Sequence, residues 1–319
     1  MNEIFLTFEL LPNEIFINIF KYLNTSDIFQ SFYNLNFRFN TLIESLNNLH
    51  LTISEDNQYI NIDLFSPYIH SLITIGDVNI NLHYFKNLHR LILHYPTNKL
   101  LEQLDIDNLP YLEYLSIPDI LFGMSSIYQK IFSNKFPNLK FCNLFGFETI
   151  ETILNWTTQT LSLRILKIGL IDFYVYKAIL YACPNLYYLQ LKMFQSYLKL
   201  SYIQIHSNLK KLEIYSEIND WQYNDQLIDI FLECVPNLEQ LSIYRSISIS
   251  KILDLIPDYN WLSSIITKRL PLLKYFILCL HIEYHLEFIE FITTETHRQL
   301  RKFFFNAHKN RYQSRLIIK

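Results

Sequence analysis

A short leucine phrase recurs along this chain and constrains its fold more than any other feature. The phrase reads Leu-x-x-Leu-x-Leu or Leu-x-x-Leu-x-Ile, which is the alternation of a strand with one buried side. Close copies begin at Leu88, Leu112, Leu163, Leu186, Leu209 and Leu238, and looser copies begin at Leu139, Leu273 and Leu300. Because most neighbouring copies begin 23 to 29 residues apart, the chain predicts a stack of similar units.

The segments between the copies predict helices that end at a proline. The copies at Leu139, Leu186 and Leu238 are each entered through Pro-Asn-Leu; proline ends a preceding helix and asparagine suits the turn that follows. Apolar residues recur at helical spacing in residues 172–186 and 223–238. Each unit is therefore predicted to contain a strand, a turn, a helix and a proline stop.

This pattern resembles the leucine-rich repeat family, of the longer strand–helix type, over roughly residues 65–319. It departs from the family where an asparagine or cysteine is expected three residues after the phrase, since Phe194, Glu217 and Ser246 stand there. The buried hydrogen-bonding ladder of the family is therefore not expected at these positions. The alternative is an ordinary α/β domain whose strands are rich in leucine.

Alternation along each strand separates the side chains that face the core from those that face outward. The fourth and sixth residues of each phrase, which are Leu or Ile, point inward. The third, fifth and seventh residues therefore point the other way. In the leucine-rich repeat family these outward residues line the concave face. Large aromatic side chains with a polar tip favour protein contacts. The predicted target-binding residues are Tyr114, Phe141, Tyr188, Tyr215, Tyr244 and Tyr275.

Three short helices are predicted ahead of the repeats. The apolar face of the first consists of Leu11, Ile15, Ile19 and Leu23, flanked by Phe16 and Phe20. Pro12 suits the first turn of that helix, and Thr25 or Ser26 can cap the second. The third has Phe39, Leu42 and Leu46 as its inward face. Three helices over about 40 residues make a very small core, so we expect them to pack on the repeats or to present apolar surface to a partner.

The same segment resembles the F-box. The family's pattern begins Leu-Pro-x-Glu-Ile, continues to Ile-Phe and x-Tyr-Leu, and then has Asp before a hydrophobic residue, an aromatic residue and a Leu. This chain supplies Leu11, Pro12, Glu14, Ile15, Ile19, Phe20, Tyr22, Leu23, Asp27, Ile28, Phe39 and Leu42. The predicted fold is therefore α/β, with a three-helix F-box over residues 1–47 and a horseshoe-like leucine-rich-repeat solenoid over residues 48–319.

The resemblance implies a non-enzymatic substrate receptor of an SCF-type (Skp–cullin–F-box) ubiquitin ligase. The F-box would dock on a Skp-family adaptor and through it on a cullin–RING scaffold, while the repeats hold an unknown target protein for ubiquitination. The residues expected to bind the adaptor are Leu11, Pro12, Ile15, Ile19, Phe20, Leu23, Asp27 and Ile28. The alternative is a stand-alone repeat scaffold, unrelated to ubiquitin, whose first helices cap the solenoid.

Composition and motifs argue against several other classes of function. The net charge is −3, which gives no electrostatic footprint for nucleic acid. Four widely separated glycines provide no phosphate-binding loop. We therefore expect no enzymatic activity, no cofactor and no metal. His281 and His285 are spaced for one face of a helix in residues 281–291, but their order is not that of a zinc motif, and a solvated charged face is favoured.

The cysteines and the hydropathy pattern predict the compartment. Cys142, Cys183, Cys234 and Cys279 are far apart, as expected of buried free thiols in a reducing environment. No signal peptide and no run of 18 uncharged apolar residues is evident. We therefore expect a cytoplasmic or nuclear protein with no membrane contact.

Overall fold

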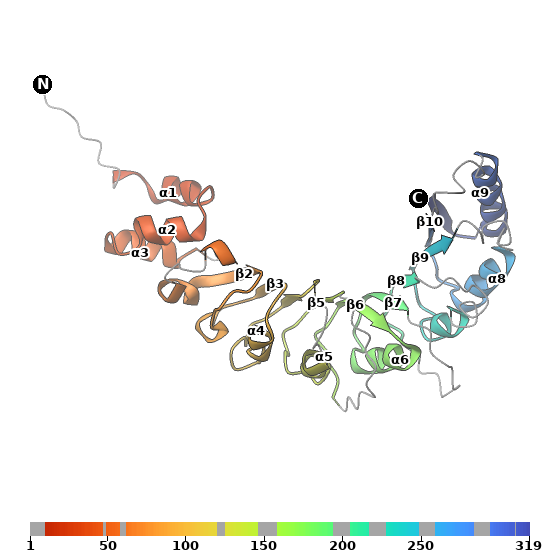
Figure 1. Ribbon diagram of the computed structural model, residues 1–319, viewed down its shortest axis with the longest axis horizontal. Helices are drawn as coiled ribbons and strands as arrows, with labels where there is room; N and C mark the ends of the chain where they lie inside the picture. Colours follow the sequence, from red (N-terminus) through yellow and green to blue (C-terminus); the bar gives the residue numbers. More distant parts are fainter. Residues whose placement is uncertain are drawn as a thin grey trace, which may run out of the picture. The chain divides into compact units, whose positions relative to one another are not determined.

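Parallel strands alternate with helices along the chain, so the fold class is α/β (Figure 1). The computed structural model describes residues 10–46, 49–57, 62–119, 125–145, 158–193, 205–216, 228–248, 259–283, 294–309 and 311–319. The chain divides into two compact units, Met1–Ile117 and Pro118–Lys319. The predicted alternation of strand and helix is confirmed, and the arrangement is compatible with a solenoid.

The first unit places three helices ahead of a parallel sheet. Its α-helices are α1 (Asn13–Phe20), α2 (Thr25–Phe32), α3 (Phe37–Glu44) and α4 (Asn98–Glu102), and its strands are β1 (Leu49–Ser54), β2 (Ile69–Ile75), β3 (Arg90–His94) and β4 (Tyr114–Ser116). Short 3₁₀ turns occupy Glu55–Asn57, Ile62–Leu64, Ser66–Tyr68 and Leu82–Tyr84. Each strand pairs in parallel with the next one along the chain.

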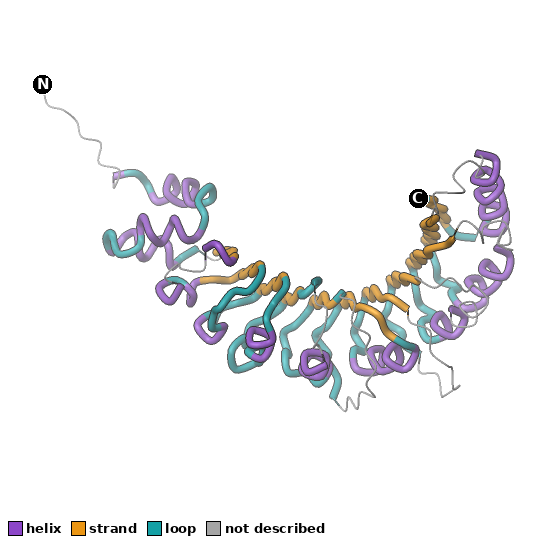
Figure 2. The backbone as a smooth tube through the Cα atoms, viewed as in Figure 1, coloured by secondary structure: helices purple, strands orange, loops and turns teal. Residues whose placement is uncertain are grey.

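The second unit continues the same alternation. Its strands are β5 (Phe141–Leu144), β6 (Ile165–Ile171), β7 (Tyr188–Met193), β8 (Lys211–Ser216), β9 (Gln240–Ser248), β10 (Tyr275–Glu283) and β11 (Gln313–Ile318). Its helices include α5 (Ser125–Phe132), α6 (Phe173–Ala182), α8 (Tyr259–Arg269) and α9 (Thr294–His308). Within this unit the helices lie on one side of the row of parallel strands (Figure 2).

The core of the second unit is formed by stacked rows of identical or similar apolar residues. Leu189 pairs with Leu212, and Leu212 pairs with Leu241; one step along, Leu191, Ile214 and Ile243 form a second row. None of these side chains is more than 1% exposed. Because the register is the same from strand to strand, each copy of the phrase buries its apolar residues against the copy before it.

Helix α6 shows how the outer layer closes over these rows. Asp172 caps the helix by accepting a hydrogen bond from the Val175 amide at 2.8 Å. The fully buried Tyr176 stacks on Phe231, with 4.2 Å between the ring centroids, and donates its hydroxyl to the Phe231 carbonyl. The buried polar tip of Tyr176 is therefore satisfied.

The asparagine of the Pro-Asn-Leu entry does more than form a turn. Its side-chain amide donates to a carbonyl of the preceding repeat: Asn185 to Leu161 at 2.9 Å and Asn237 to Ser207 at 3.1 Å. Asn208 makes the equivalent bond to Pro184, and Asn87 makes it to Pro67 in the first unit. A ladder of asparagines therefore links repeats at the start of the strands. Of the three positions that lack the asparagine or cysteine of the leucine-rich repeat family, Phe194 and Glu217 lie outside the described residues.

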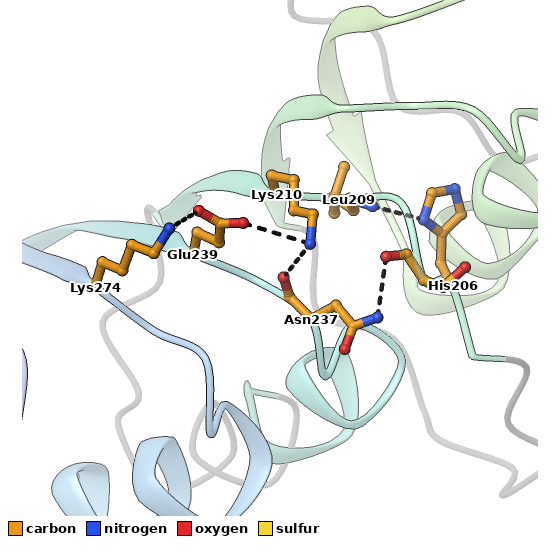
Figure 3. A network of polar contacts seen from close by, with 7 residues as sticks. His206, Leu209, Lys210, Asn237, Glu239 and Lys274 are labelled. Carbon is orange, nitrogen blue, oxygen red and sulfur yellow. Dashed lines mark hydrogen bonds and ion pairs between the residues drawn. The ribbon is translucent and has the colours of Figure 1, made fainter.

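A buried histidine joins this ladder (Figure 3). The Leu209 amide donates to Nδ1 of His206 at 3.1 Å, so Nε2 carries the proton that His206 donates to the Cys183 carbonyl at 2.9 Å. Nearby, the Glu239 carboxylate lies between the ammonium groups of Lys210 and Lys274, at 3.4 and 2.5 Å. The imidazole is a structural bridge between two repeats, while the lysine–glutamate chain runs along the exposed starts of three strands.

Two of the predicted elements are wrong. The looser copy of the phrase at Leu300 lies in helix α9, where Leu300, Phe304 and His308 are buried at a spacing of four residues. That spacing fits a helix and competes with the strand-like reading; the strand comes later, as β11. Residues 281–283, predicted as part of a helix, end strand β10, and residues 284–293 lie outside the described residues.

Burial lowers the pKa of His206, so stability is predicted to fall in acid. The neutral form is favoured in the folded state; stability is therefore fully present above the unfolded pKa of about 6.5 and is lost as the pH falls below it. The loss from this group is limited to about 1.4 kcal/mol per pH unit, the value for one proton. Urea unfolding at pH 7.5 and 5.5 measures it.

The matched comparison uses His206→Gln and His83→Gln, since His83 is exposed. The drop in unfolding free energy between the two pH values should be smaller in His206→Gln than in the wild type and unchanged in His83→Gln. An equal drop in all three proteins would show that His206 is not a source of the pH dependence.

Candidate protein-interaction surfaces

The three N-terminal helices share a small aromatic core. Phe16 on α1 meets Phe39 on α3 edge to face, with 4.7 Å between their ring centroids, and Phe20 lies 5.0 Å from Phe32 on α2. Phe16 and Phe39 have no exposed area, and Phe20 is almost fully buried. Large rings at these positions give a short helical segment enough apolar area to pack.

Arg38 on α3 ties down the start of α1. Its guanidinium donates to the Asn13 side-chain oxygen at 2.8 Å and to the Leu11 carbonyl, and it lies 5.5 Å from the centroid of the Phe16 ring. Asn13 is the first residue of α1, and Pro12, as its N-cap, accepts no side-chain bond of the usual kind. The planar fork of Arg38 therefore fixes the chain entry that a side-chain cap would otherwise fix.

Helix α2 attaches this segment to the sheet of the first unit. The Thr25 hydroxyl donates to the His50 carbonyl on β1. Phe29 lies 5.1 Å from Phe65 and 5.9 Å from Tyr68, whose hydroxyl donates to the Glu44 carboxylate. Of the two expectations for so small a core, packing on the residues that follow is therefore confirmed.

The predicted apolar face of α1 is only partly buried. Phe20 belongs to the core, but Ile15 is exposed and Leu11, Ile19 and Leu23 are of intermediate exposure. The alternative in which Leu11, Ile15, Ile19 and Leu23 form the core of a cap is therefore not observed; Phe16 and Phe20, which were expected to flank this face, are the buried pair. The helix is also shorter than predicted, and Asn24, not Thr25 or Ser26, caps α2 by accepting from the Asp27 amide at 2.8 Å.

The other residues predicted to bind an adaptor divide between surface and core. Pro12 and Asp27 are exposed, and Ile28 is buried on α2. Ile28 and Phe20 can therefore support the surface but cannot themselves contact a partner in this conformation.

Large apolar side chains on the surface accompany Ile15. Leu10, Ile15, Tyr22 and Phe37 are 73%, 43%, 89% and 86% exposed. Ile15 and Ile19 are one turn apart on α1, and Tyr22 lies in the turn that follows the helix. Arg38, the neighbour of Phe37, binds the carbonyl of Leu11, the neighbour of Leu10. Leu10, Tyr22 and Phe37 were not predicted as contact residues. Tyr22 stands in the F-box-like pattern, and Leu10 and Phe37 lie within two residues of the N-caps Pro12 and Asn36, which are the signals that the sequence offered. We call Leu10, Ile15, Ile19, Tyr22 and Phe37 the helical apolar surface.

On the strand face of the second unit, the predicted outward aromatic residues meet. Tyr215 and Tyr244, paired in register on β8 and β9, stack with 4.3 Å between parallel rings. Phe145, just after β5, meets Tyr215 edge to face at 5.4 Å, and the Lys192 ammonium lies 5.5 Å from the Phe145 centroid. Burial raises the pKa of the Tyr215 hydroxyl, so it stays neutral and able to donate a hydrogen bond.

A second row of outward residues lies nearer the start of the strands. The Lys211 ammonium lies 4.5 Å from the Tyr188 ring centroid and 2.9 Å from the Glu213 carboxylate. Tyr188 donates to the Gln190 side chain. Burial, followed by the charge of Glu213, raises the pKa of the Tyr188 hydroxyl. Charged and aromatic side chains are therefore held in fixed positions across β7 and β8.

The remaining predicted target-binding residues are also on strands. Phe141 and Tyr188 are of intermediate exposure at the starts of β5 and β7, and Tyr275 is 45% exposed at the start of β10. Tyr114 belongs to the first unit, where the Arg90 guanidinium covers its ring at 4.1 Å from the centroid. Tyr114 is therefore not grouped with the Tyr215–Tyr244 stack.

Within the described part of the chain, the structure gathers no metal-binding group of histidine, cysteine and acidic residues. The four cysteines are free and buried, and burial raises the pKa of the Cys234 thiol to about 11. Such thiols are poor nucleophiles at neutral pH. Among the described residues, none of the helices has the length and apolar character needed to cross a membrane.

A scan against protein-family models and a search of curated proteins find no match for this chain. The assignment of a function therefore depends on the residues and contacts described above.

Replacement of Arg38 is predicted to loosen α1. Arg38→Ala removes the hydrogen bonds to Asn13 and Leu11 and a ring contact, and partly exposed charged bonds of this kind contribute about 1 to 2.7 kcal/mol together. Hydrogen exchange of the amides in residues 13–20 measures local opening, which should become roughly 5- to 100-fold more frequent. Arg38→Lys keeps the charge without the planar fork and should give an intermediate effect. Unchanged exchange in Arg38→Ala would show that Arg38 does not hold α1.

Proposed function

We propose that this protein is a substrate receptor in which the N-terminal helices dock on a Skp-family adaptor and the strand face of the repeats binds a target protein. The two regions correspond to an F-box and a leucine-rich-repeat solenoid. The observation that carries the proposal is the helical apolar surface: Phe16 and Phe20 of α1 are buried in the core, whereas Ile15 on α1 and Tyr22 just after it are exposed. Exposed apolar side chains grouped on one short segment are typical of a docking site.

The order of residues adds support. Leu11, Pro12 and Ile15 belong to the F-box-like pattern. Pro12 and Ile15 are exposed, and Leu11 is of intermediate exposure. A purely structural cap would bury its apolar residues against the strands. In this protein that role belongs to α2, through Thr25 and Phe29.

The strand face supports target binding. Tyr215, Tyr244 and Phe145 form a rigid aromatic group with polar tips, of the composition found at the centres of protein interfaces. In the proposed complex this chain would contribute proximity, raising the effective concentration of the target's lysines at a ubiquitin-charged conjugating enzyme. The chemistry would belong to other subunits, and the chain itself would need no cofactor.

The second candidate is a stand-alone repeat scaffold that binds a partner without any link to ubiquitin. The hydrogen bond from Thr25 on α2 to the His50 carbonyl on β1 favours this candidate, because helices that cap a sheet make contacts of this kind. The adaptor separates the two candidates, because only the receptor binds it through α1.

The decisive measurement is binding of a purified Skp-family adaptor to the full chain by isothermal titration or pulldown. Ile15→Asp places a charge on the helical apolar surface and should weaken binding at least tenfold, since an unpaired charge at an apolar contact costs about 1.4 kcal/mol or more. Because Ile15 is exposed, the variant should unfold at nearly the wild-type urea concentration.

The matched control is Gln30→Glu, which adds the same charge at an exposed position of α2. It should bind like the wild type. If well-folded wild-type protein fails to bind the adaptor, the receptor proposal is wrong in its adaptor half and the scaffold becomes the better description. Equal weakening by both variants would point to charge alone and not to the helical apolar surface.

A further inference from the structure

Helix α9 is attached to the second unit by one of its sides. Leu300 and Phe304 are buried there, and the Phe304 ring centroid lies 5.9 Å from that of Phe276 on β10. The Ser263 hydroxyl on α8 donates to the Ala307 carbonyl near the end of α9 at 2.7 Å. The other side of α9 therefore faces solvent in a fixed orientation.

That outward side carries exposed cations around an exposed phenylalanine. Lys302, Phe305 and Lys309 follow one another at steps of three and four residues, so they lie along one line of the helix. Arg301 lies one turn before Phe305. All four residues are exposed, Phe305 to 51%. We call Arg301, Lys302, Phe305 and Lys309 the basic stripe.

The charges of the basic stripe are not balanced by the part of the chain that the structure describes. Within that part, no ion pair is present at Arg301, Lys302 or Lys309, whereas Arg269 on α8 pairs with two carboxylates at 2.6 and 3.0 Å. The sequence of residues 296–319 contains no aspartate or glutamate, although the net charge of the chain is −3. The basic stripe is therefore complementary in charge to an acidic partner.

The spacing within the basic stripe indicates the conformation of that partner. Lys302 and Lys309 are about 10.5 Å apart along the helix axis, at a rise of 1.5 Å per residue. Two acidic residues seven positions apart on a partner helix have the same separation and share one face. Residues on one face of an extended segment are about 6.6 or 13 Å apart. A helix therefore matches the two lysines better than an extended segment does.

We propose that the basic stripe binds an acidic amphipathic helix of a partner protein. Two carboxylates seven positions apart would lie against Lys302 and Lys309, and an apolar residue between them would pack on Phe305. Nucleic acid fits less well because the net charge of the chain is negative. A membrane surface fits less well because the apolar side of α9 is buried in the protein.

This surface goes beyond the proposed function. It uses no residue of the helical apolar surface and no residue of the Tyr215–Tyr244 stack. Binding at the basic stripe and binding of the adaptor can therefore be measured, and can fail, separately.

The test measures binding of a labelled acidic peptide to the full chain by fluorescence anisotropy. The peptide is about 20 residues long, so that it is helical alone, and it repeats glutamate and leucine on one side every seven residues. We expect it to bind at least about fivefold more tightly than the same peptide with glutamine for glutamate, since several exposed charge pairs add. A peptide of equal composition with its glutamates opposite its leucines should also bind less tightly. High salt should remove these differences by screening.

Charge variants decide whether the basic stripe is responsible. Lys302→Glu combined with Lys309→Glu should weaken binding of the acidic peptide about tenfold, because attraction becomes repulsion at both positions. Lys86→Glu combined with Lys135→Glu makes the same change of charge at other exposed positions and should leave the affinity within about twofold. Lys302→Gln combined with Lys309→Gln should give a smaller loss and replaces the reversal if that protein does not fold.

Two phenylalanines of α9 provide a matched pair for the apolar contact. Phe303 is 47% exposed and Phe305 is 51% exposed, but they are two residues apart and so lie on nearly opposite sides of the helix. Phe305→Ala should weaken binding of the acidic peptide about threefold or more, whereas Phe303→Ala should bind like the wild type. Equal losses in both variants would show that the contact is not made by the basic stripe.

The remaining outcomes also decide the inference. Equal binding of the glutamate and glutamine peptides, or a preference that survives both sets of lysine variants, would overturn it. Tighter binding of phosphatidylserine vesicles or of a single-stranded oligonucleotide than of the acidic peptide, lost in the charge reversal, would replace the protein partner with a membrane or a nucleic acid. Adaptor binding should be unchanged in all of these variants, so a failure here leaves the proposed function as it stands.

Discussion

Matching register over the leucine phrases of neighbouring parallel strands is the constraint on which the second unit depends; the register of β6 against β7 shifts after the phrase, between Ile168 and Leu170. Leu189, Leu212 and Leu241 lie side by side because each strand begins at the same point of its repeat. One step of slip would bring the outward tyrosines into the core and the leucines into solvent, since strand side chains alternate. Two sets of bonds hold the starting point: the asparagine side chains that reach back one repeat, and single carbonyls such as Tyr187 that accept from two successive amides, Lys210 and Lys211.

The same register creates the candidate target site. Residues that are far apart in sequence become neighbours on the outward side. Tyr215 on β8 stacks on Tyr244 on β9, a contact that needs two neighbouring repeats. A cross-strand aromatic pair stabilises the sheet and also offers a rigid surface to a partner. The stability of the sheet and the proposed target contact therefore depend on one row of residues, and Lys192 beside that row is positioned by the same pairing.

Sequence periodicity predicted the strands well where the spacing of apolar residues clearly separates the two-residue period of a strand from the 3.6-residue period of a helix. Phrases such as Leu186-x-x-Leu189-x-Leu191 fit a strand and no helix, and they form β7 to β9 as expected. The segment around Leu300 fits both periods, and tertiary packing of Leu300 and Phe304 against the sheet decided for a helix. Side-chain hydrogen bonds between repeats, such as that of Asn185, leave no periodic signal that separates them from a turn asparagine.

The candidate sites show a similar limit. Position in the phrase identified Tyr215 and Tyr244 as outward residues, because strand geometry alone determines it. On α1, helical spacing grouped Ile15 with Ile19, but only the packing of Phe16 against Phe39 determined which side of the helix faces solvent.

The helical apolar surface shows where the N-terminal helices depart from what folding alone favours. Tyr22 and Phe37 are 89% and 86% exposed, so their rings contribute little apolar burial to the isolated chain. Phe16 and Phe39, in contrast, are fully buried and form the core of the same helices. Large apolar side chains left in solvent beside a complete core are typical of a surface that a partner covers, and this is the role that the proposed function gives them.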